Sequence, residues 1–277
     1  MTLDKFRLEN KNVLITGAAG LLGKEHASAI LEVGGKVILT DVTKKKLEDT
    51  KKILSSQFNP NSILISKMDV TKKQSIQKVS KDLSKSKIRV DVLINNAAIN
   101  PKVGKKLNPA KKIRFENLSP EDWNQELDVG LKGAFLCSQI FGTKMAADSK
   151  GGIILNISSD LSVISPDQRI YQLKGISEEN QPVKPVTYSV VKNGLIGLTK
   201  YVATYWASKG VRCNALSPGG VLTDQDNEFI KKLNRLIPLG RMARKDEYRS
   251  TVQYLCSEAS SYVNGQNIIV DGGRSIW

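Results

Sequence analysis

Short apolar runs alternate with segments of helical periodicity along most of the chain. The runs that predict buried strands cover residues 12–16, 36–41, 63–68, 91–95, 152–157, 211–217 and 268–270. Apolar residues recur three or four positions apart over 21–33, 44–57 and 74–86, as they do on one face of an amphipathic helix. Longer helical patterns over 123–147 and 187–209 precede the strands at 152–157 and 211–217.

This alternation predicts an α/β fold with a doubly wound parallel sheet flanked by helices, because parallel strands joined through helices need right-handed crossovers. No linker rich in Pro, Gly or Ser interrupts the pattern, so we expect a single domain over residues 1–277. Two stretches, near 99–118 and 160–187, have little periodic pattern. Long loops in a compact domain are usually functional or disordered, and we expect insertions that bind substrate there.

Composition excludes several other classes of protein. The 277 residues are 40% hydrophobic and 25% charged, as in an average soluble globular protein. The three cysteines are widely spaced and His26 is the only histidine, so we predict neither a disulfide framework nor a metal site. Residues 1–10 are polar, and no apolar run reaches the ~18 residues of a membrane span. We therefore expect a cytoplasmic protein without a membrane partner.

The formal net charge is high, at +15, and it is unevenly distributed. Residues 44–114 contain 19 basic and 5 acidic side chains. A basic excess suggests nucleic acid, a membrane surface or an anionic substrate as partner. Most of these residues are lysines with few aromatic residues between them, whereas base recognition favours arginine and single-stranded grooves use aromatic platforms. We predict a solvated basic surface and no nucleic-acid partner.

A glycine-rich turn joins the first predicted strand to the first predicted helix. Gly17, Gly20 and Gly23 allow a tight turn and a close approach of the backbone to a pyrophosphate, which the helix N-terminus attracts. Asp41 ends the second strand, 24 residues after Gly17, where an acidic residue binds the adenosine ribose. Its carboxylate would repel a 2′-phosphate. We predict NAD as cofactor, with NADP less favoured; the lysines at 44–46 weaken this preference.

Tyr188 and Lys192 are four residues apart in a helical pattern and therefore share one helix face. A phenol with a pKa of ~10 needs help to transfer protons near neutral pH, and a neighbouring ammonium group lowers that pKa. Ser159 follows the strand at 152–157 and can donate a hydrogen bond to a carbonyl or alcohol oxygen. These three residues form a candidate proton-transfer site.

The order of these motifs resembles that of the short-chain dehydrogenases/reductases, which have a Rossmann-type fold. The matching motifs are the glycine turn, Asp41, Asp69, Asn95-Asn96-Ala97-Ala98, Asn156-Ile-Ser-Ser159, Tyr188-xxx-Lys192, Pro218-Gly219-x-Val221-x-Thr223 and Asp271-Gly272-Gly273. The resemblance covers nearly the whole chain. It implies that Tyr188 is the catalytic acid/base, that Lys192 lowers its pKa and holds the nicotinamide ribose, and that Ser159 orients the reacting oxygen.

The resemblance also implies the cofactor-binding residues. Asp69 and Val70 would border the adenine, the segment 96–98 its ribose, and the segment 218–223 the nicotinamide end. The full expected set is Gly17, Gly20, Leu21, Leu22, Gly23, Asp41, Val42, Asp69, Val70, Asn96, Ala97, Ala98, Ile157, Tyr188, Lys192, Pro218, Gly219, Val221 and Thr223.

Three positions depart from the family pattern. The glycines are spaced G-xx-G-xx-G instead of G-xxx-G-x-G, and Ala98 stands where the family usually has glycine. Gly130 stands where the family usually has a fourth catalytic residue, an asparagine, which supports a water leading to the lysine largely through its main-chain carbonyl. Glycine retains that carbonyl, so activity is expected, although the proton relay can differ.

The segment 160–188 and the end, 271–277, resemble a bacterial subgroup of the family tied to surface-sugar and flagellin modification. This implies a sugar phosphate or nucleotide sugar as substrate. Gln168, Arg169, Gln181 and Lys184 are candidate substrate contacts in the second insertion. Basic residues of the first insertion are candidates for holding an anionic group: Lys102, Lys105, Lys106, Lys111, Lys112 and Arg114.

Two alternatives stay open at this stage. A non-catalytic dinucleotide-binding sensor would explain Gly130 and the basic segment, but it would not need Ser159, Tyr188 and Lys192. A 3-oxoacyl-carrier-protein ketoreductase would suit a basic surface, but Asp41 argues against the NADPH that it would use. The family resemblance further implies a homodimer or homotetramer formed through the helices at 123–147 and 187–209.

Overall fold

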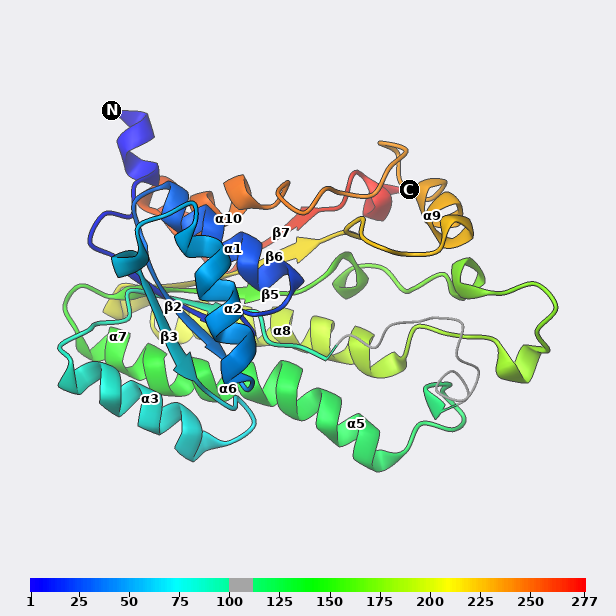
Figure 1. The fold of residues 1–277 in the computed structure, drawn as a ribbon, viewed down its shortest axis with the longest axis horizontal. Helices are drawn as coiled ribbons and strands as arrows, with labels where there is room; N and C mark the ends of the chain where they lie inside the picture. The colour runs from blue at the N-terminus through cyan, green and yellow to red at the C-terminus, as the bar shows by residue number, and fades with distance from the viewer. Residues whose placement is uncertain (100–111) are drawn as a thin grey trace.

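The computed structural model describes residues 1–99 and 112–277. Within these residues, seven parallel strands form one sheet in the order β3-β2-β1-β4-β5-β6-β7 (Figure 1). The strands are β1 Asn12–Thr16, β2 Lys36–Asp41, β3 Ile63–Lys67, β4 Val92–Asn95, β5 Gly152–Ile157, β6 Val211–Pro218 and β7 Asn267–Val270. The strand order reverses between β1 and β4, and the carboxyl ends of strands at such a point form a ligand-binding crevice.

Helices cover both faces of the sheet (Figure 1). They are α1 Leu21–Glu32, α2 Lys44–Ser55, α3 Lys73–Lys85, α5 Pro120–Leu127, α6 Gly133–Cys137, α7 Thr143–Ala147, α8 Val186–Tyr205, α9 Asn227–Asn234 and α10 Arg249–Leu255. Two π-helical segments, Asp128–Lys132 and Ser138–Gly142, join α5, α6 and α7. Short 3-10 helices occur at Thr2–Phe6, Pro60–Ser62, Asp160–Ser162, Gln168–Tyr171, Glu178–Asn180, Ala207–Lys209, Glu258–Ser260 and Arg274–Ile276.

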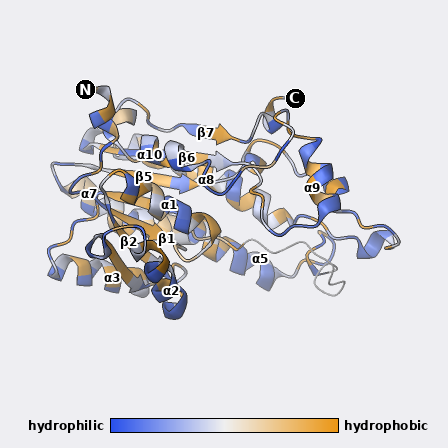
Figure 2. Cartoon of the chain, turned by 45° about the horizontal axis from the view of Figure 1, so that its top comes forward, coloured by the Kyte–Doolittle hydropathy of each residue, from blue (hydrophilic) through white to orange (hydrophobic). Residues whose placement is uncertain are grey.

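Alternate residues of the central strands supply two separate cores. Val13 and Ile15 of β1 pack on the side of α1, α2 and α10. Leu14 packs on the opposite side, with α3, α6, α7 and α8. Both faces of these strands are therefore buried, which explains why β1, β2 and β4 appear in the sequence as continuous apolar runs. Figure 2 shows hydrophobic residues in orange along the central strands β1 and β2 and hydrophilic residues in blue on outer helices such as α2.

The three cysteines lie in different parts of these cores. Cys137 belongs to α6 and Cys213 to β6, both in the core next to α8, whereas Cys256 follows α10 in the other core. None is in a disulfide. Burial raises the pKa of each thiol to about 12.

The predicted α/β fold is confirmed, and each predicted strand agrees with the structure to within one residue at either end. The long helix expected over 123–147 begins earlier, at Pro120, because the Ser119 side chain accepts a hydrogen bond from Asp122 N and caps the first turn. The π-helical segments also interrupt its regular hydrogen bonding. Sequence periodicity did not indicate them, since a single extra residue in a turn barely changes the apolar pattern.

The second predicted insertion is compact although it contains only 3-10 turns. Ile170 from the insertion packs with Leu233, Ile237 and Met242, around α9 and the segment after it. Inside it, the Gln181 amide group accepts a hydrogen bond from Leu173 N and donates to Leu173 O and Ile176 O. The insertion is therefore packed against α9, and its own turns are held together by Gln181.

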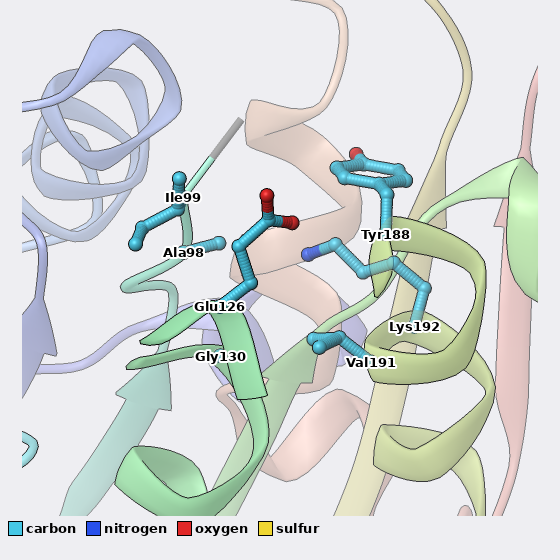
Figure 3. Close-up of a pocket in the computed structure, with 7 residues that line it drawn as sticks. All are labelled: Ala98, Ile99, Glu126, Gly130, Tyr188, Val191 and Lys192. Carbon is cyan, nitrogen blue, oxygen red and sulfur yellow. The ribbon is translucent and has the colours of Figure 1, made fainter. Parts of the chain in front are cut away.

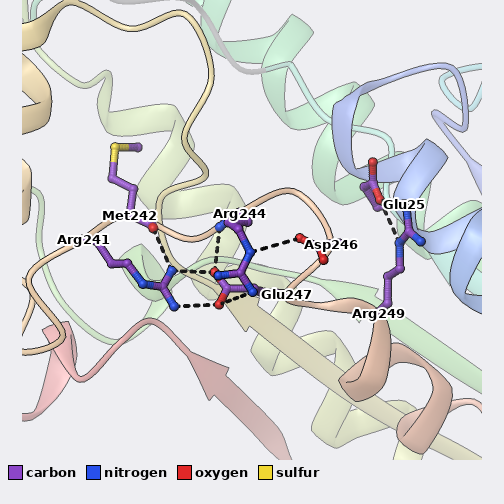
Figure 4. A network of polar contacts seen from close by, with 7 residues as sticks. All are labelled: Glu25, Arg241, Met242, Arg244, Asp246, Glu247 and Arg249. Atoms are coloured by element: carbon purple, nitrogen blue, oxygen red, sulfur yellow. Dashed lines mark hydrogen bonds and ion pairs between the residues drawn. The ribbon is translucent and has the colours of Figure 1, made fainter.

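Ion pairs lie within the segment before α10 and between α10 and α1 (Figure 4). Arg241 donates two hydrogen bonds to Glu247, at 2.6 and 2.7 Å, and Glu247 also accepts from the backbone N of Arg244. Arg249, in α10, pairs with Glu25 of α1 at 2.5 Å. The Arg249 pair joins α10 to α1, whereas the pair of Arg241 and Glu247 stabilises the segment before α10.

Among the basic residues of the segment 44–114 that the structure describes, those of α2 and α3 lie on the outer faces of these helices. The lysines of α2 are exposed or half-buried, while Leu47, Thr50 and Leu54 face the core. Lys102, Lys105, Lys106 and Lys111 lie outside the described residues. No helix of the described residues is long and apolar enough to cross a membrane, and no cluster of three potential metal ligands occurs among them.

Candidate active site

The glycine turn places its backbone tightly around the start of α1. Gly17 has a φ of +61°, a conformation that favours glycine, and a Cβ there would lie 2.9 Å from Ala97 Cα. A Cβ on Gly23 would lie 2.5 Å from Gly17 O. Gly20 is the N-cap of α1 and supplies no side-chain cap, so the first N–H groups of the helix remain available to an anion. This backbone fits the pyrophosphate of a dinucleotide.

The segment after β4 is tied to this turn by Thr16 and Asn96. Thr16 Oγ1 accepts hydrogen bonds from Asn96 N and Ala97 N, each at 3.0 Å. The Asn96 side chain donates to Thr16 O and Gly17 O, at 2.9 and 3.1 Å. Asn96 thus holds the two loops together with its amide group, and sequence reasoning did not include Thr16 in the site.

Two acidic residues lie where the sequence places the adenosine end. Asp41 is half-buried at the end of β2, and its Oδ1 accepts a hydrogen bond from Thr43 N at 3.1 Å. Val42 next to it is exposed. Asp69 follows β3 and accepts from both the N and the Oγ1 of Thr71. Each carboxylate still has oxygen lone pairs that can accept hydrogen bonds from the hydroxyl groups of a ligand.

The loop after β6 closes the other end of the crevice. Gly219 N donates to Val270 O at 2.9 Å, and Gly219 O accepts from the buried Tyr248 hydroxyl at 3.0 Å. Val221 forms an isolated bridge with Ala243. Thr223 N donates to Gln225 Oε1 at 2.7 Å. The expected nicotinamide-end segment 218–223 is therefore anchored by its backbone, which leaves its side chains for ligand contacts.

Ser159, Tyr188 and Lys192 are brought together at the carboxyl end of β5. Lys192 Nζ lies 5.5 Å from the centre of the Tyr188 ring and donates to Ile157 O at 2.8 Å. Ser158 Oγ donates to Lys192 O at 2.8 Å, which fixes the end of β5 to α8. The four-residue spacing places both side chains on the same face of α8, as predicted (Figure 3).

Burial dominates the electrostatics of this group. It raises the pKa of Tyr188 to about 12, against the effect of the nearby Ser159 hydroxyl, which lowers it. Burial, together with the smaller effect of the Lys184 charge, lowers the pKa of Lys192 to about 7. Lys192 Nζ donates its hydrogen bond to the Ile157 carbonyl, and the lowering of the Tyr188 pKa by Lys192 stays a prediction.

Ser159 is part of a buried chain of polar contacts that sequence reasoning missed. Its hydroxyl donates to Asp160 Oδ1 at 2.8 Å, and Leu161 N donates to Ser159 Oγ at 3.2 Å. Asp160 is 3% exposed and pairs with Arg274, 8% exposed, at 2.7 Å. The sequence showed no sign of this chain of contacts beyond two charged residues, Asp160 and Arg274, in segments without a periodic pattern.

Gly130 lies in the first π-helical segment, opposite Val191. A Cβ on Gly130 would lie 2.5 Å from Val191 Cγ1, so the valine occupies the space of a side chain at 130. Glu126, one turn earlier on the same helix, is 8% exposed and accepts from Thr187 Oγ1 at 2.5 Å. A small pocket next to Tyr188 and Lys192 is lined by Glu126, Gly130 and Val191, together with Ala98 and Ile99 (Figure 3).

The residues of the second insertion that we expected to contact substrate make different interactions in the structure. Gln181 is bonded to backbone groups, as described above, and Gln168 is bonded to the backbone of Lys184. Arg169 is exposed and pairs with Asp167. Arg114, from the first insertion, donates to Glu178 O and Gln181 O. Of these residues, Lys184 is the one whose side chain reaches Tyr188.

Comparison with known proteins settles the family. A family model described as enoyl-(acyl carrier protein) reductase matches residues 17–275. The chain is 33% identical to the NAD-dependent glycerol dehydrogenase of Listeria innocua, over 98% of this chain and 96% of that protein. The chain belongs to the short-chain dehydrogenase/reductase family. It is therefore an NAD(P)-dependent oxidoreductase, as the sequence predicts.

Two further matches show which other proteins the chain is similar to. The D-threitol dehydrogenase of Mycolicibacterium smegmatis is 31% identical over 98% of this chain and 95% of that protein. A crystal structure of a gluconate 5-dehydrogenase from Burkholderia cenocepacia, in complex with NADP and tartrate, superposes with a TM-score of 0.84, covers 99% of both chains and is 26% identical. None of these matches bears on the surface-sugar subgroup, which stays a prediction.

Proposed function

We propose that this protein interconverts a secondary alcohol and a ketone on a small polyhydroxylated substrate, with NAD as cofactor. The observation that carries this proposal is the placement of Ser159, Tyr188 and Lys192 beside a glycine turn shaped for a pyrophosphate. A proton-transfer group next to a dinucleotide crevice is what alcohol oxidation requires. A sensor without catalysis would need only the crevice.

The cofactor-binding residues are those expected from the sequence, with the glycine turn at the pyrophosphate and Asp41 at the adenosine ribose. The bound dinucleotide supplies the acceptor or donor of the hydride. Asp41 supports NAD, because its carboxylate would repel a 2′-phosphate. The glycerol dehydrogenase relative is named NAD-dependent, whereas the gluconate 5-dehydrogenase was solved with NADP. The preference for NAD over NADP is thus our proposal and depends on Asp41.

The residues of the site have separate parts in the reaction. In oxidation, the Tyr188 phenolate removes the proton of the substrate hydroxyl; in reduction, the phenol returns it. Ser159 orients the substrate oxygen, provided that its hydroxyl turns from Asp160 toward the ligand. Lys192, when protonated and released from Ile157 O, stabilises the phenolate. Formation of the active arrangement therefore includes a rearrangement of two hydrogen bonds.

Relatives named for glycerol, D-threitol and gluconate support a polyol or sugar-derived substrate. We propose an anionic member of this class, such as a sugar phosphate or nucleotide sugar, within bacterial surface-glycan synthesis. The basic residues that the sequence has between 102 and 114 support an anionic substrate. We further propose that the protein forms a homodimer or homotetramer through the helices α5, α6, α7 and α8. Its proposed location is the cytoplasm.

A substrate screen tests the proposal. The purified protein is incubated with NAD or NADP and with polyols, sugar acids, sugar phosphates and nucleotide sugars, and the absorbance of the reduced cofactor is followed. We expect NAD-dependent turnover of at least one polyhydroxylated compound, and its loss in Tyr188→Phe. Turnover of 3-oxoacyl thioesters with NADPH alone would favour the ketoreductase alternative.

A further inference from the structure

The single proton of the Ser159 hydroxyl is already engaged in a hydrogen bond. Ser159 Oγ donates to Asp160 Oδ1 at 2.8 Å, and Leu161 N donates to Ser159 Oγ at 3.2 Å. An ionised carboxylate only accepts hydrogen bonds, so Ser159 is the donor toward Asp160. The serine oxygen has one lone pair left and no further proton. As long as this arrangement holds, Ser159 can only accept a hydrogen bond from a ligand.

The Asp160 carboxylate is fixed on its other side by Arg274. Arg274 Nη1 donates to Asp160 Oδ2 at 2.7 Å, and both side chains are buried. Asp160 Oδ1 accepts from Ser159 and also from Leu161 N, the latter at 2.9 Å. The turn that carries Arg274 is held by the Asp271 carboxylate, which accepts from two backbone N–H groups. Each oxygen of Asp160 thus has its own partners, and Oδ1 stays directed at Ser159.

This arrangement affects alcohols and ketones differently. An alcohol can donate its hydroxyl proton to the remaining lone pair of Ser159 while the bond to Asp160 stays intact. The oxygen of a ketone only accepts, so Ser159 must leave Asp160 before it can donate to a ketone. Hydrogen bonds to a charged group are roughly twice as strong as those between neutral groups, which makes this step costly.

The cost of turning the Ser159 hydroxyl appears in different kinetic constants for the two directions. Negative charge develops on the substrate oxygen in the transition state, so the hydroxyl must donate to it in oxidation and in reduction alike. In oxidation the hydroxyl turns after the alcohol has bound, and the cost lowers kcat. In reduction it turns when the ketone binds, and the cost raises KM.

Asp160 also acts on Tyr188 through its charge. Burial, and to a smaller extent the negative charge of Asp160, raise the pKa of Tyr188 to about 12, against the effect of the Ser159 hydroxyl. Loss of that charge, with the Ser159 proton free to donate to the phenolate, should therefore lower the pKa of Tyr188. Other titratable groups near Tyr188 stay the same in such a variant: Lys184, Lys192, Glu126 and Tyr171.

We propose that Asp160, held by Arg274, is a positioning residue that keeps the Ser159 proton away from the substrate oxygen and makes the site selective for the alcohol over the ketone. The inference rests on the proposed function, because it concerns how Ser159 acts in that reaction. Arg274 comes from a segment 114 residues further along the chain. The position of that segment therefore controls a hydroxyl group of the active site.

Asp160→Asn tests the inference without removing the side chain. Arg274 only donates hydrogen bonds, so the amide oxygen of the asparagine should face Arg274 and its NH2 group should face Ser159. The Ser159 proton is then free for the substrate. Asp167→Asn is the matched control, because Asp167 lies in the same insertion and pairs with Arg169 but is not bonded to Ser159.

A double variant controls for the buried charge that the single variant leaves behind. Asp160→Asn deprives Arg274 of its carboxylate in the interior, which destabilises the protein. Asp160→Asn combined with Arg274→Gln removes both charges and retains an amide donor for the asparagine oxygen. The kinetic and pKa changes expected of the single variant are expected of the double variant as well, and their absence from it would count against the inference.

Glycerol with dihydroxyacetone, and D-gluconate with 5-keto-D-gluconate, serve as pairs of alcohol and ketone. In Asp160→Asn we expect KM for the ketone to fall by about fivefold or more, and kcat for oxidation to rise by a similar factor. KM for the alcohol and kcat for reduction should stay within about twofold of wild type. Asp167→Asn should change none of the four. Calorimetry of the ketone with the NAD-bound protein, and of the alcohol with the NADH-bound protein, gives the affinities directly.

A titration of tyrosine absorbance separates the inference from the proposed function, because it needs no substrate. The difference between each protein and its counterpart with Tyr188→Phe isolates Tyr188. We expect a lower pKa of Tyr188 in Asp160→Asn than in the wild type or Asp167→Asn. A lower pKa with tighter ketone binding, but without turnover of either pair, would refute the proposed function and uphold the inference. An unchanged pKa, or equal changes in affinity for alcohol and ketone, would overturn the inference.

Discussion

Val191 occupies the space into which a side chain at Gly130 would project, with Val191 Cγ1 only 2.5 Å from the position of such a Cβ. The family usually carries an asparagine at position 130. Here the small residue on the long helix and the β-branched residue on α8 fit each other. At this departure from the family pattern, Gly130 and Val191 thus pack tightly against each other next to Tyr188 and Lys192.

This fit predicts the stability of three variants. Gly130→Ala should lower the free energy of unfolding by about 1–3 kcal/mol, because the added methyl overlaps Val191 in a packed interior. Gly130→Ala combined with Val191→Ala should be less destabilised than the sum of the two single variants. Denaturation in urea measures all three. Additive effects would mean that the two positions do not share the same space.

The pH dependence of the two reaction directions should differ. Oxidation needs the Tyr188 phenolate, and burial raises the pKa of Tyr188 to about 12, so the phenolate fraction grows tenfold per pH unit below that value. We expect kcat/KM for oxidation to rise from about pH 6 to about pH 10. Reduction uses the phenol, which is already protonated over this range, and should not rise with pH. A maximum for oxidation below neutral pH would contradict the assignment of Tyr188 as base.

Tyr188→Phe tests the same assignment without a pH change. The variant keeps the ring under Lys184 but lacks the proton-transfer group, so we expect kcat to fall by about 10²–10⁴-fold. Binding of NADH, measured by its fluorescence, should be nearly unchanged. A variant that keeps wild-type turnover would exclude Tyr188 as the acid/base.

The buried pair of Asp160 and Arg274 should be important for stability and for Ser159. Arg274→Met leaves the Asp160 carboxylate unpaired in the interior and should lower the free energy of unfolding by about 3–5 kcal/mol. Arg241→Met removes an arginine from the more exposed pair with Glu247 and should have a much smaller effect. Thermal and chemical denaturation of both variants give the comparison. Equal effects would show that burial does not distinguish the two pairs.

Asp41 should determine the choice of cofactor. The wild type is expected to bind NADH more tightly than NADPH, and Asp41→Ala should shift the ratio of the two affinities toward NADPH by about tenfold or more. Glu48→Ala removes an exposed carboxylate from α2 and serves as the control. Fluorescence titration with both cofactors requires no substrate. Tighter binding of NADPH by the wild type would refute the role given to Asp41.

The sequence predicted the strands well because both faces of the central strands are buried, and continuous apolar runs such as Val13–Ile15 mark them clearly. It also predicted that Tyr188 and Lys192 share a helix face, since this follows from local geometry. Asp160 and Arg274 are 114 residues apart and have no shared pattern, so their pairing needed the fold. Glu126 likewise needed the fold, because it lines the pocket next to Tyr188 only through the packing of α5 against α8.

The three buried thiols provide probes of local opening. A thiol reacts with an alkylating reagent as the thiolate, and burial raises the pKa of each cysteine to about 12, so modification requires exposure to solvent. Cys137 would report the opening of a helix, Cys213 the separation of sheet strands, and Cys256 the release of α10 from α1. Labelling rates at these three residues would show, in one sample, which layer of the molecule loosens first.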